Sequence, residues 1–317
     1  MKKEKPWKSF DEQLKLLTDR GLLVDNSAAA LSYLERLGYY RLSGYFYPFR
    51  QLEITQAEDG KLQHQRHNQF IEGSRFEDVV NLYVFDKRLR LLALDALERI
   101  ELAVRVDIAY LLGERDKYAH ENPACLHGHF SNKVQKKTGM TLHETWLESY
   151  HRFVHRARRE PFVAHYLAKY QKLPIWVAIE IWDFGALSKL YSGLHIADQD
   201  FIAQKYGAPD GKAFASWLRG LNFVRNVSAH HSRLWNINVL ERASVWDKDE
   251  NWLAQNNARS FYYFCLMQQM LATICPNSCW KQRFKELLMS FPEVGNKAVK
   301  LSDMGVTEDW REWDLWL

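Results

Sequence analysis

The stretch FEDVVNLYVFDKRLRLLALDALERIELAVRVDIAYLL, residues 76–112, decides the fold class of this chain. Its apolar side chains recur every three or four positions, which is the spacing of one face of an α-helix. These positions are Val79, Leu82, Val84, Leu89, Leu92, Leu97, Ile100, Val104 and Ile108. The stretch therefore predicts one long helix.

Helical spacing also dominates outside this stretch, and no run of short alternating strands is evident. Asn26 or Ser27 can cap a helix that Gly38 ends. Glu53–Ser74 and residues 113–141, which are polar or rich in glycine, are expected to be loops. The remaining helices are expected at Phe10–Thr18, Ala28–Leu37, Leu142–His155, Ile175–Tyr191, Asp198–Tyr206, Lys212–Trp235, Ala258–Ile274 and Cys279–Met289.

The predicted architecture is an all-α bundle. We expect residues 1–75 to form an N-terminal helical and aromatic appendage, residues 76–290 the main helical domain, and residues 291–317 a tail. In that tail Trp310, Trp313 and Trp316 have the spacing of one helical face.

The composition indicates a folded protein of a reducing compartment. Of 317 residues, 47% are hydrophobic and 14% aromatic, which excludes extensive disorder. Four cysteines are too few to cross-link a chain of this length, so a cytoplasmic location is expected. The basic N-terminus lacks the apolar core of a signal peptide, and no apolar stretch is long enough to span a membrane. The net charge of +4 favours polyanionic partners only weakly.

Two local clusters are candidates for contact with RNA. Tyr39–Pro48 contains five aromatic residues around Arg41, including Tyr40, and could stack on bases; packing of the N-terminal arm is the alternative. The second cluster is basic and could follow a phosphate backbone, although a solvated surface is the alternative. It consists of Arg152, Arg156, Arg158 and Arg159, with Lys133, Lys136 and Lys137 upstream.

A candidate catalytic motif lies in the sequence RGLNFVRNVSAHHSRLWN, residues 219–236. Arg225 and His230 form an R-x4-H pattern, which alone is weak, since Arg115 and His120 also match it. The expected helix supports the first match, because Asn226, His230 and Arg233 would share one face. Arg225 and His230 would converge only if the helix begins or kinks between them, or if a second subunit completes the site.

The residue types fit RNA cleavage. The ribose 2′-hydroxyl can attack the adjacent phosphate, so neither a metal nor a bound water is required as nucleophile. Histidine can transfer protons near neutral pH, and a guanidinium can hold the phosphate as charge develops on it. A structural Arg–His pair that ties helices together is the alternative.

The motif at 225–236 resembles the active-site signature of HEPN ribonucleases, specifically the Abi-like abortive-infection proteins of the AbiD/AbiF type. Further blocks resemble this family in order and spacing, over about residues 10–275. They are residues 17–22, 37–45, 85–105 and 174–185.

The resemblance implies a helical bundle that dimerises, with one motif from each subunit in a shared cleft. It implies RNA cleavage in bacterial phage defence, by a toxin that a small non-coding RNA restrains. It also implies that Glu101 and Arg105 face the Arg225/His230 centre, with His231 and Arg233 in support. Glu98 shares the face of Glu101 and Arg105, and a solvent-facing ion pair from Glu101 to Arg105 is the alternative.

Other polar residues are weaker candidates. Glu180 lies within an apolar helix and needs a partner, while Trp235 is expected in the core rather than against a base. No cofactor or metal is expected. Cys125, His127, His129 and the nearby His120 do not form a defined ligand set, and Cys275 and Cys279 lack the partners that zinc requires.

Overall fold

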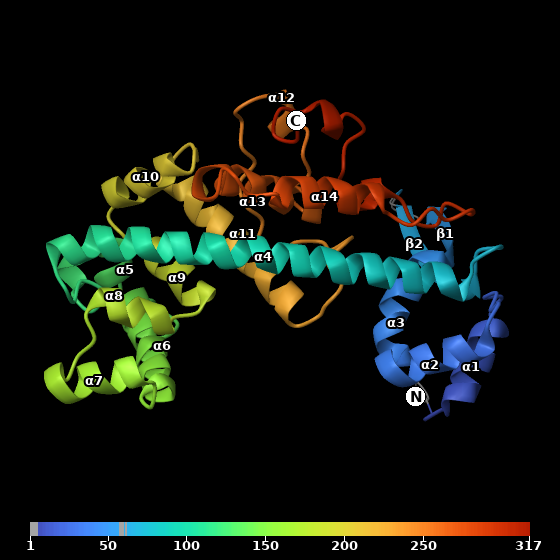
Figure 1. The fold of residues 1–317 in the computed structure, drawn as a ribbon, viewed down its shortest axis with the longest axis horizontal. Coiled ribbons are helices and arrows are strands. Elements are labelled where there is room, and N and C mark those ends of the chain that lie inside the picture. The colour runs from blue at the N-terminus through green and yellow to red at the C-terminus, as the bar shows by residue number, and fades with distance from the viewer. Residues whose placement is uncertain (1–5, 57–59, 61) are drawn as a thin grey trace. The chain divides into compact units, whose positions relative to one another are not determined.

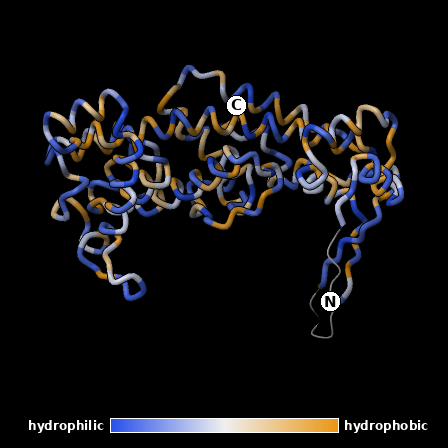
Figure 2. Tube along the Cα trace, turned by 90° about the horizontal axis from the view of Figure 1, so that it is seen from below, coloured by the Kyte–Doolittle hydropathy of each residue, from blue (hydrophilic) through white to orange (hydrophobic). Residues whose placement is uncertain are grey.

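The structure is a computed structural model that describes residues 6–56, 60 and 62–317. Helices account for nearly all of its regular structure, so the all-α prediction is confirmed (Figure 1). In Figure 2, hydrophobic residues recur along the helical turns in the way that amphipathic helices require.

The chain divides into two compact units. Unit 1 comprises residues 1–90 and 283–304, and unit 2 comprises residues 91–282 and 305–317. The long helix α4, Phe76–Arg115, and helix α14, Trp280–Met289, contribute residues to both units. The boundaries expected at residues 75 and 290 stay a prediction.

Unit 1 begins with α1, Phe10–Thr18, and α2, Ser27–Leu37. Asn26 caps α2 through the Ala29 amide, and Gly38 ends it with a φ of 79°, a value that favours glycine. Helix α3, Tyr39–Phe46, and a 3-10 turn, Tyr47–Phe49, follow. In the core of this unit the Tyr45 hydroxyl donates to Asp86 Oδ2 at 2.5 Å, and Arg90 donates to that hydroxyl at 3.0 Å.

The loop predicted at Glu53–Ser74 is wrong. Strands β1, Arg50–Gln56, and β2, Leu62–Phe70, pair there as an antiparallel hairpin. Nearly all of their side chains face solvent, so the apolar alternation that marks a half-buried strand is missing from the sequence. The prediction for residues 57–59 and 61 lies outside the described residues.

Unit 2 packs a set of helices against α4, whose Ile100, Val104 and Ile108 are fully buried. In its core α11, Gly211–Ala229, approaches α13, Ser260–Ile274, very closely: a Cβ on Gly220 would lie 2.4 Å from the Tyr263 ring. The other elements are η2 (Pro123–Cys125), α5 (Gly128–Ser131), α6 (Leu142–Ala157), α7 (Pro161–Tyr170), α8 (Ile175–Ala178), η3 (Ile179–Ile181), α9 (Phe184–Tyr191), α10 (Ile196–Lys205) and α12 (Glu250–Leu253).

The C-terminal segment carries the short turns η4, Leu301–Met304, and η5, Trp310–Glu312. Trp310, Trp313 and Trp316 are all buried, and the Trp316 ring stacks on Phe261 of α13 at 5.9 Å. The three tryptophans therefore do not lie on one helix, because the only regular element among them is the 3-10 turn η5. Their apolar rings nevertheless pack in the core of unit 2.

Candidate active site

The helix that carries the R-x4-H motif ends inside the motif. Asp210 caps α11 by accepting from the Ala213 amide, and the last helical residue is Ala229. His230 follows as the C-cap, and His231 has a left-handed φ of 57°. The prediction of one helix through Trp235 is therefore wrong, and Asn226, His230 and Arg233 do not share a helical face.

The burial of two apolar residues after the motif explains why α11 ends at Ala229 although no glycine follows. Leu234 and Trp235 are fully buried, and the Ser260 hydroxyl donates to the Trp235 carbonyl at 2.8 Å. The turn at His231 lets both apolar side chains reach the core, so tertiary packing prevails over helix propensity. Trp235 is thus a core residue, as expected.

A cavity of about 420 Å³ in unit 2 lies against the motif. It is lined by charged side chains of α4 and α11, namely Glu98, Glu101, Arg105 and Arg225, and by Leu94, Leu97 and Leu102. Glu98, Glu101 and Arg105 thus share one face of α4, as their spacing predicts. The fold brings this face to Arg225, which lies 120 residues further along the chain.

Arg105 is held by Glu101 of its own helix and by residues 180–182, which lie at η3 and just after it. Its Nη2 donates to Glu101 Oε1 at 2.5 Å and to the Trp182 carbonyl at 2.6 Å, and Glu180 Oε2 lies 3.9 Å from Nη1. The Arg105 and Glu101 side chains are only 13% and 17% exposed. The ion pair is therefore present, but it lines the cavity instead of facing bulk solvent. Glu180, which is half exposed, finds its partner in Arg105.

The electrostatic environment of Glu101 is mixed. Burial raises the pKa of this carboxyl, and the charges of Arg105 and Arg225 oppose that rise, while the Asp183 carboxylate adds to it. Glu101 and Arg225 are thus close enough to interact electrostatically. Together with Glu98, the Glu101 carboxylate offsets the charge of the two guanidinium groups that line the cavity.

Arg225 differs from Arg105 in having no hydrogen-bond or ion-pair partner among the described residues, although it is half-buried against the cavity. His230 is exposed at the end of α11, and its ring forms no hydrogen bond or ion pair with Arg225 or another described side chain. Among the described residues no hydrogen bond joins Arg225 to His230, as a structural Arg–His pair would require. Asn226 and Arg233 are half-buried, and His231 is exposed.

Two residues of this region were not anticipated from the sequence. Asp183 starts α9 by accepting from the Ala186 amide at 2.7 Å, and Asn222 lies one turn before Arg225 on α11. A Cβ on Gly185 would lie 3.3 Å from Asp183 Oδ1 and 3.6 Å from Asn222 Nδ2, so both side chains meet at the start of α9. The spacing of Asn222 from Asn226 was an available signal.

The helix predicted at Ile175–Tyr191 is also wrong in one respect. It breaks into α8, η3 and α9, and the break at Trp182 and Asp183 exposes the Trp182 carbonyl to Arg105. Asp183 is a strong N-cap residue, which favours a new helix at Phe184.

The second R-x4-H match does not form a comparable site. Arg115 makes a bidentate pair with Asp198, at 2.8 and 2.9 Å, and His120 is fully buried. Among the described residues, no three His, Cys, Asp or Glu side chains gather closely enough to hold a metal ion.

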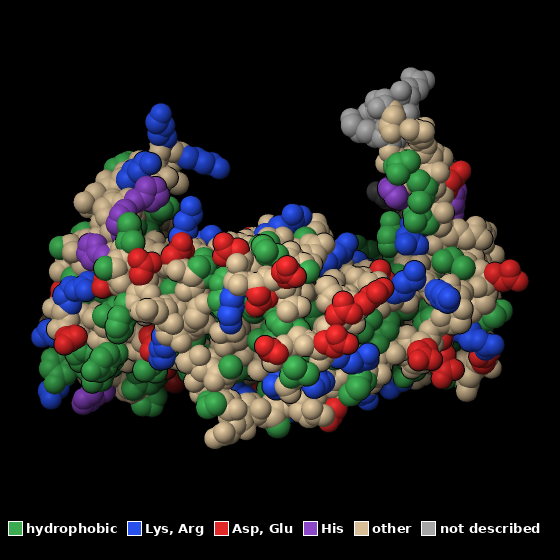
Figure 3. Space-filling view, turned by 90° about the horizontal axis from the view of Figure 1, so that it is seen from above, with side chains coloured by type: hydrophobic (Ala, Val, Ile, Leu, Met, Phe, Trp, Pro, Cys, Tyr) green, Lys and Arg blue, Asp and Glu red, His purple; other side chains and the backbone are tan. Residues whose placement is uncertain are grey.

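Of the two clusters predicted to contact RNA, the basic one lies at the surface and the aromatic one does so only in part. Arg152 and Arg156 lie in the last turns of α6, not in a turn after it, and Arg158 and Arg159 follow; all four are exposed. Lys and Arg side chains project from the left-hand part of Figure 3, which belongs to unit 2. On α3, Tyr40 and Arg41 are exposed, whereas Tyr45 and Phe46 pack in the core of unit 1, so packing accounts for part of the aromatic segment.

Fold and site define a helical protein in which Arg225 of an R-x4-H motif lines a cavity together with Glu98, Glu101 and Arg105. Residues 32–236 match the family model of the Abi-like proteins, a span that includes Arg105, Arg225 and His230. The chain belongs to the Abi-like protein family. No curated protein and no solved structure matches it. In the described part of the chain, no helix combines the length and apolar character needed to cross a membrane.

Proposed function

We propose that this chain is a metal-independent endoribonuclease of the HEPN type, acting in bacterial abortive infection against phages. The observation that carries the proposal is the half-buried, unpaired Arg225 facing a cavity that Arg105 also lines. A guanidinium whose donors have no acceptor in the protein is available to an anionic ligand, and an RNA phosphate supplies two oxygens for bidentate binding. Membership of the Abi-like family supports the biological setting.

In the proposed reaction, the 2′-hydroxyl oxygen bonds to the adjacent phosphorus and the bond from phosphorus to the 5′-oxygen breaks. The 2′-proton leaves to a base, and the 5′-oxygen takes a proton from an acid. His230 serves as one of these proton-transfer groups, and Arg225 stabilises the negative charge that develops on the phosphoryl oxygens. Arg105 positions the phosphate, Glu101 holds Arg105 in place through their ion pair, and Asn226 orients its neighbours. The products are a 2′,3′-cyclic phosphate and a 5′-hydroxyl.

The experiment that tests this proposal is digestion of generic RNA by the purified chain, with EDTA or with magnesium. We expect equal cleavage in both, because the nucleophile comes from the substrate itself. Cleavage that requires magnesium would point to a metal-dependent mechanism. RNA binding without cleavage would favour the alternative, a catalytically silent HEPN module that grips RNA or a protein.

We further propose that the chain works as a homodimer, because Arg225 and His230 form no hydrogen bond with each other within one subunit. Exposed Leu102, Val106 and Tyr110 follow at intervals of four on one face of α4. Leu102 lines the cavity, and Val106 and Tyr110 line an adjacent pocket with Arg105. An apolar stripe beside the site suits an interface that would bring in the second motif.

Replacing Val106 by aspartate should therefore convert the dimer into monomers and lower RNA cleavage in parallel, since an unpaired carboxylate would be buried at the interface. Light scattering measures the mass, and Ile196→Asp, at an exposed apolar position of α10, is the matched control. A wild-type monomer with full activity would contradict the composite site.

A small non-coding RNA that restrains the toxin is the proposed regulator, bound at the arginines of α6. Each phosphate contact releases counterions, so the affinity should fall steeply with salt. Alanine at Arg152, Arg156 and Arg159 should weaken binding of the non-coding RNA encoded beside the gene and flatten the salt dependence. Tight binding by this variant across a salt series would mean that the cluster is solvated surface.

A further inference from the structure

Unit 1 contains a cavity of about 830 Å³ that the proposed reaction does not use. Residues of α1, α3 and β2, and those just before α1, line it. Its volume falls within the range of sites that bind small organic molecules.

Several of the aromatic rings that line the cavity are largely exposed to solvent. Trp7 is 86% exposed and Tyr40 is 91% exposed, and both line the cavity. Phe10 and Tyr47, also exposed, add two further rings from α1 and from the turn after α3. Exposed rings of this size are rarely left gathered at one place, since burying them is favourable.

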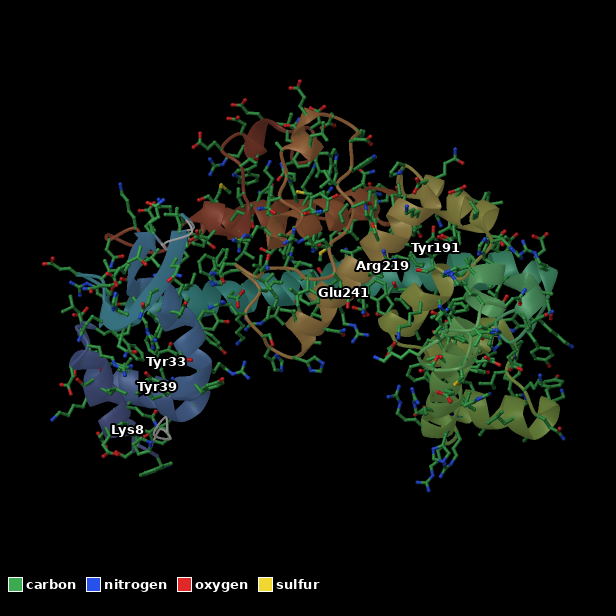
Figure 4. All side chains as sticks on the ribbon, turned by 180° about the vertical axis from the view of Figure 1, so that it is seen from behind. Lys8, Tyr33, Tyr39, Tyr191, Arg219 and Glu241 are labelled. Carbon is green, nitrogen blue, oxygen red and sulfur yellow. The ribbon has the colours of Figure 1, made fainter. Side chains whose placement is uncertain are left out.

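The charged residues of the same lining are all basic. Lys8, Arg20 and Arg50 line the cavity, no aspartate or glutamate does so, and none of the three makes an ion pair in the described part of the chain. Arg50 Nε is buried and has no acceptor there. Figure 4 labels Lys8 and Tyr39, both of which line this cavity. The charge of the lining therefore favours an anionic ligand.

Side chains that can donate and accept hydrogen bonds complete the lining. Gln13, Ser43 and Asn68 face the cavity, and Gln13 Oε1 is buried with no donor among the described residues. An amide can pair with the edge of a base, as it does in sites that read unpaired nucleotides. Rings, cations and amides together match a base and its phosphate better than a lipid or an acidic peptide.

We propose that this cavity binds unpaired nucleotides of single-stranded RNA. Bases stack on Trp7 and Tyr40, and backbone phosphates pair with Lys8, Arg20 and Arg50. The choice of RNA as the polymer rests on the proposed function. The site lies in unit 1, whereas Arg225 and Arg105 lie in unit 2, so it is a separate recognition site and not part of the cleavage centre.

The test measures binding of a fluorescent oligouridine of about ten nucleotides, with 2′-O-methyl riboses that cannot be cleaved. Trp7→Ala and Tyr40→Ala should each weaken binding by roughly tenfold, the effect of losing one stacked base. Tyr40→Phe keeps the ring and should bind like the wild type. Lys8→Gln should also lower the slope of log affinity against log salt by about 0.7.

Phe201→Ala is the matched control, because Phe201 is 68% exposed on α10 of unit 2. Equal binding by Trp7→Ala, Tyr40→Ala and wild type overturns the proposal, as does equal affinity for a duplex of the same length. Binding of a proline-rich peptide in place of the oligonucleotide would assign the rings to a polyproline ligand and overturn it too.

Cleavage by the same variants separates this proposal from the proposed function. If only the cavity assignment is wrong, wild type and variants cleave RNA and bind the probe equally well. If only the ribonuclease assignment is wrong, Trp7→Ala and Tyr40→Ala still lose probe binding, but no protein in the series cleaves RNA.

Discussion

Replacing His230 by alanine should lower the rate of RNA cleavage by a factor of roughly a hundred to ten thousand, the usual contribution of one acid–base group. Arg225→Ala should cause a loss of similar size, because in the proposed reaction this guanidinium stabilises the transition state. Neither side chain forms a hydrogen bond or ion pair in the described part of the chain, so both variants should fold. Single-turnover cleavage of a labelled RNA measures the effect.

Arg219→Ala is the matched control for Arg225→Ala. Arg219 is exposed on the same helix, away from the residues that line the cavity, and Figure 4 labels it. We expect this variant to cleave RNA at the wild-type rate. Folded His230→Ala protein that cleaves normally would rule out the role assigned to His230.

His120 should dominate the acid sensitivity of unit 2. Its side chain is fully buried among Trp146, Tyr150 and Trp182, and neither ring nitrogen has a hydrogen-bond partner in the described part of the chain. Burial lowers the pKa of His120 from 6.5 to about 3, and the nearby His143 contributes to the fall. The folded protein thus holds this ring neutral in moderately acidic solution.

The unfolded chain protonates His120 below pH 6.5, whereas the folded chain does so only near pH 3. Stability is therefore lost as the pH falls through this window, by about 1.4 kcal/mol per pH unit from this group. His120→Phe fits the same aromatic surroundings and cannot be protonated. Its free energy of unfolding should exceed that of the wild type by a growing margin below pH 6.5.

Urea unfolding at a series of pH values measures this difference, with His165→Phe as a control at an exposed position of α7. The variant should still cleave RNA at neutral pH, because His120 does not line the cavity around Arg225. Parallel pH profiles for wild type and His120→Phe would contradict the burial argument.

Helices could be predicted best from the sequence where apolar residues recur regularly every three or four positions. The helix expected at residues 76–112 is α4, Phe76–Arg115, because a long buried face repeats every turn. Gly38 and Asn26 marked the ends of α2 as expected. The hairpin of β1 and β2 was missed because its stability does not come from an alternating apolar face that a sequence displays.

The candidate site could be predicted only in part, because its geometry depends on contacts between distant segments. Spacing placed Glu98, Glu101 and Arg105 on one face of α4, and the structure adds that Arg225 lines the same cavity. The end of α11 at Ala229 was not predictable, since no glycine or proline marks it and the burial of Trp235 determines it. The contact of Arg105 with the Trp182 carbonyl could not be predicted either, because every residue carries a backbone carbonyl.

In the proposed mechanism the RNA supplies its own nucleophile at the Arg225/His230 site. The most direct test compares an RNA with a second RNA that carries one 2′-deoxyribose at the scissile position, and identifies the new 3′-end by mass spectrometry. We predict that the all-ribose RNA gives a 2′,3′-cyclic phosphate and that the deoxy position stays intact. Cleavage at the deoxy position, with a 5′-phosphate on the downstream product, would contradict the account.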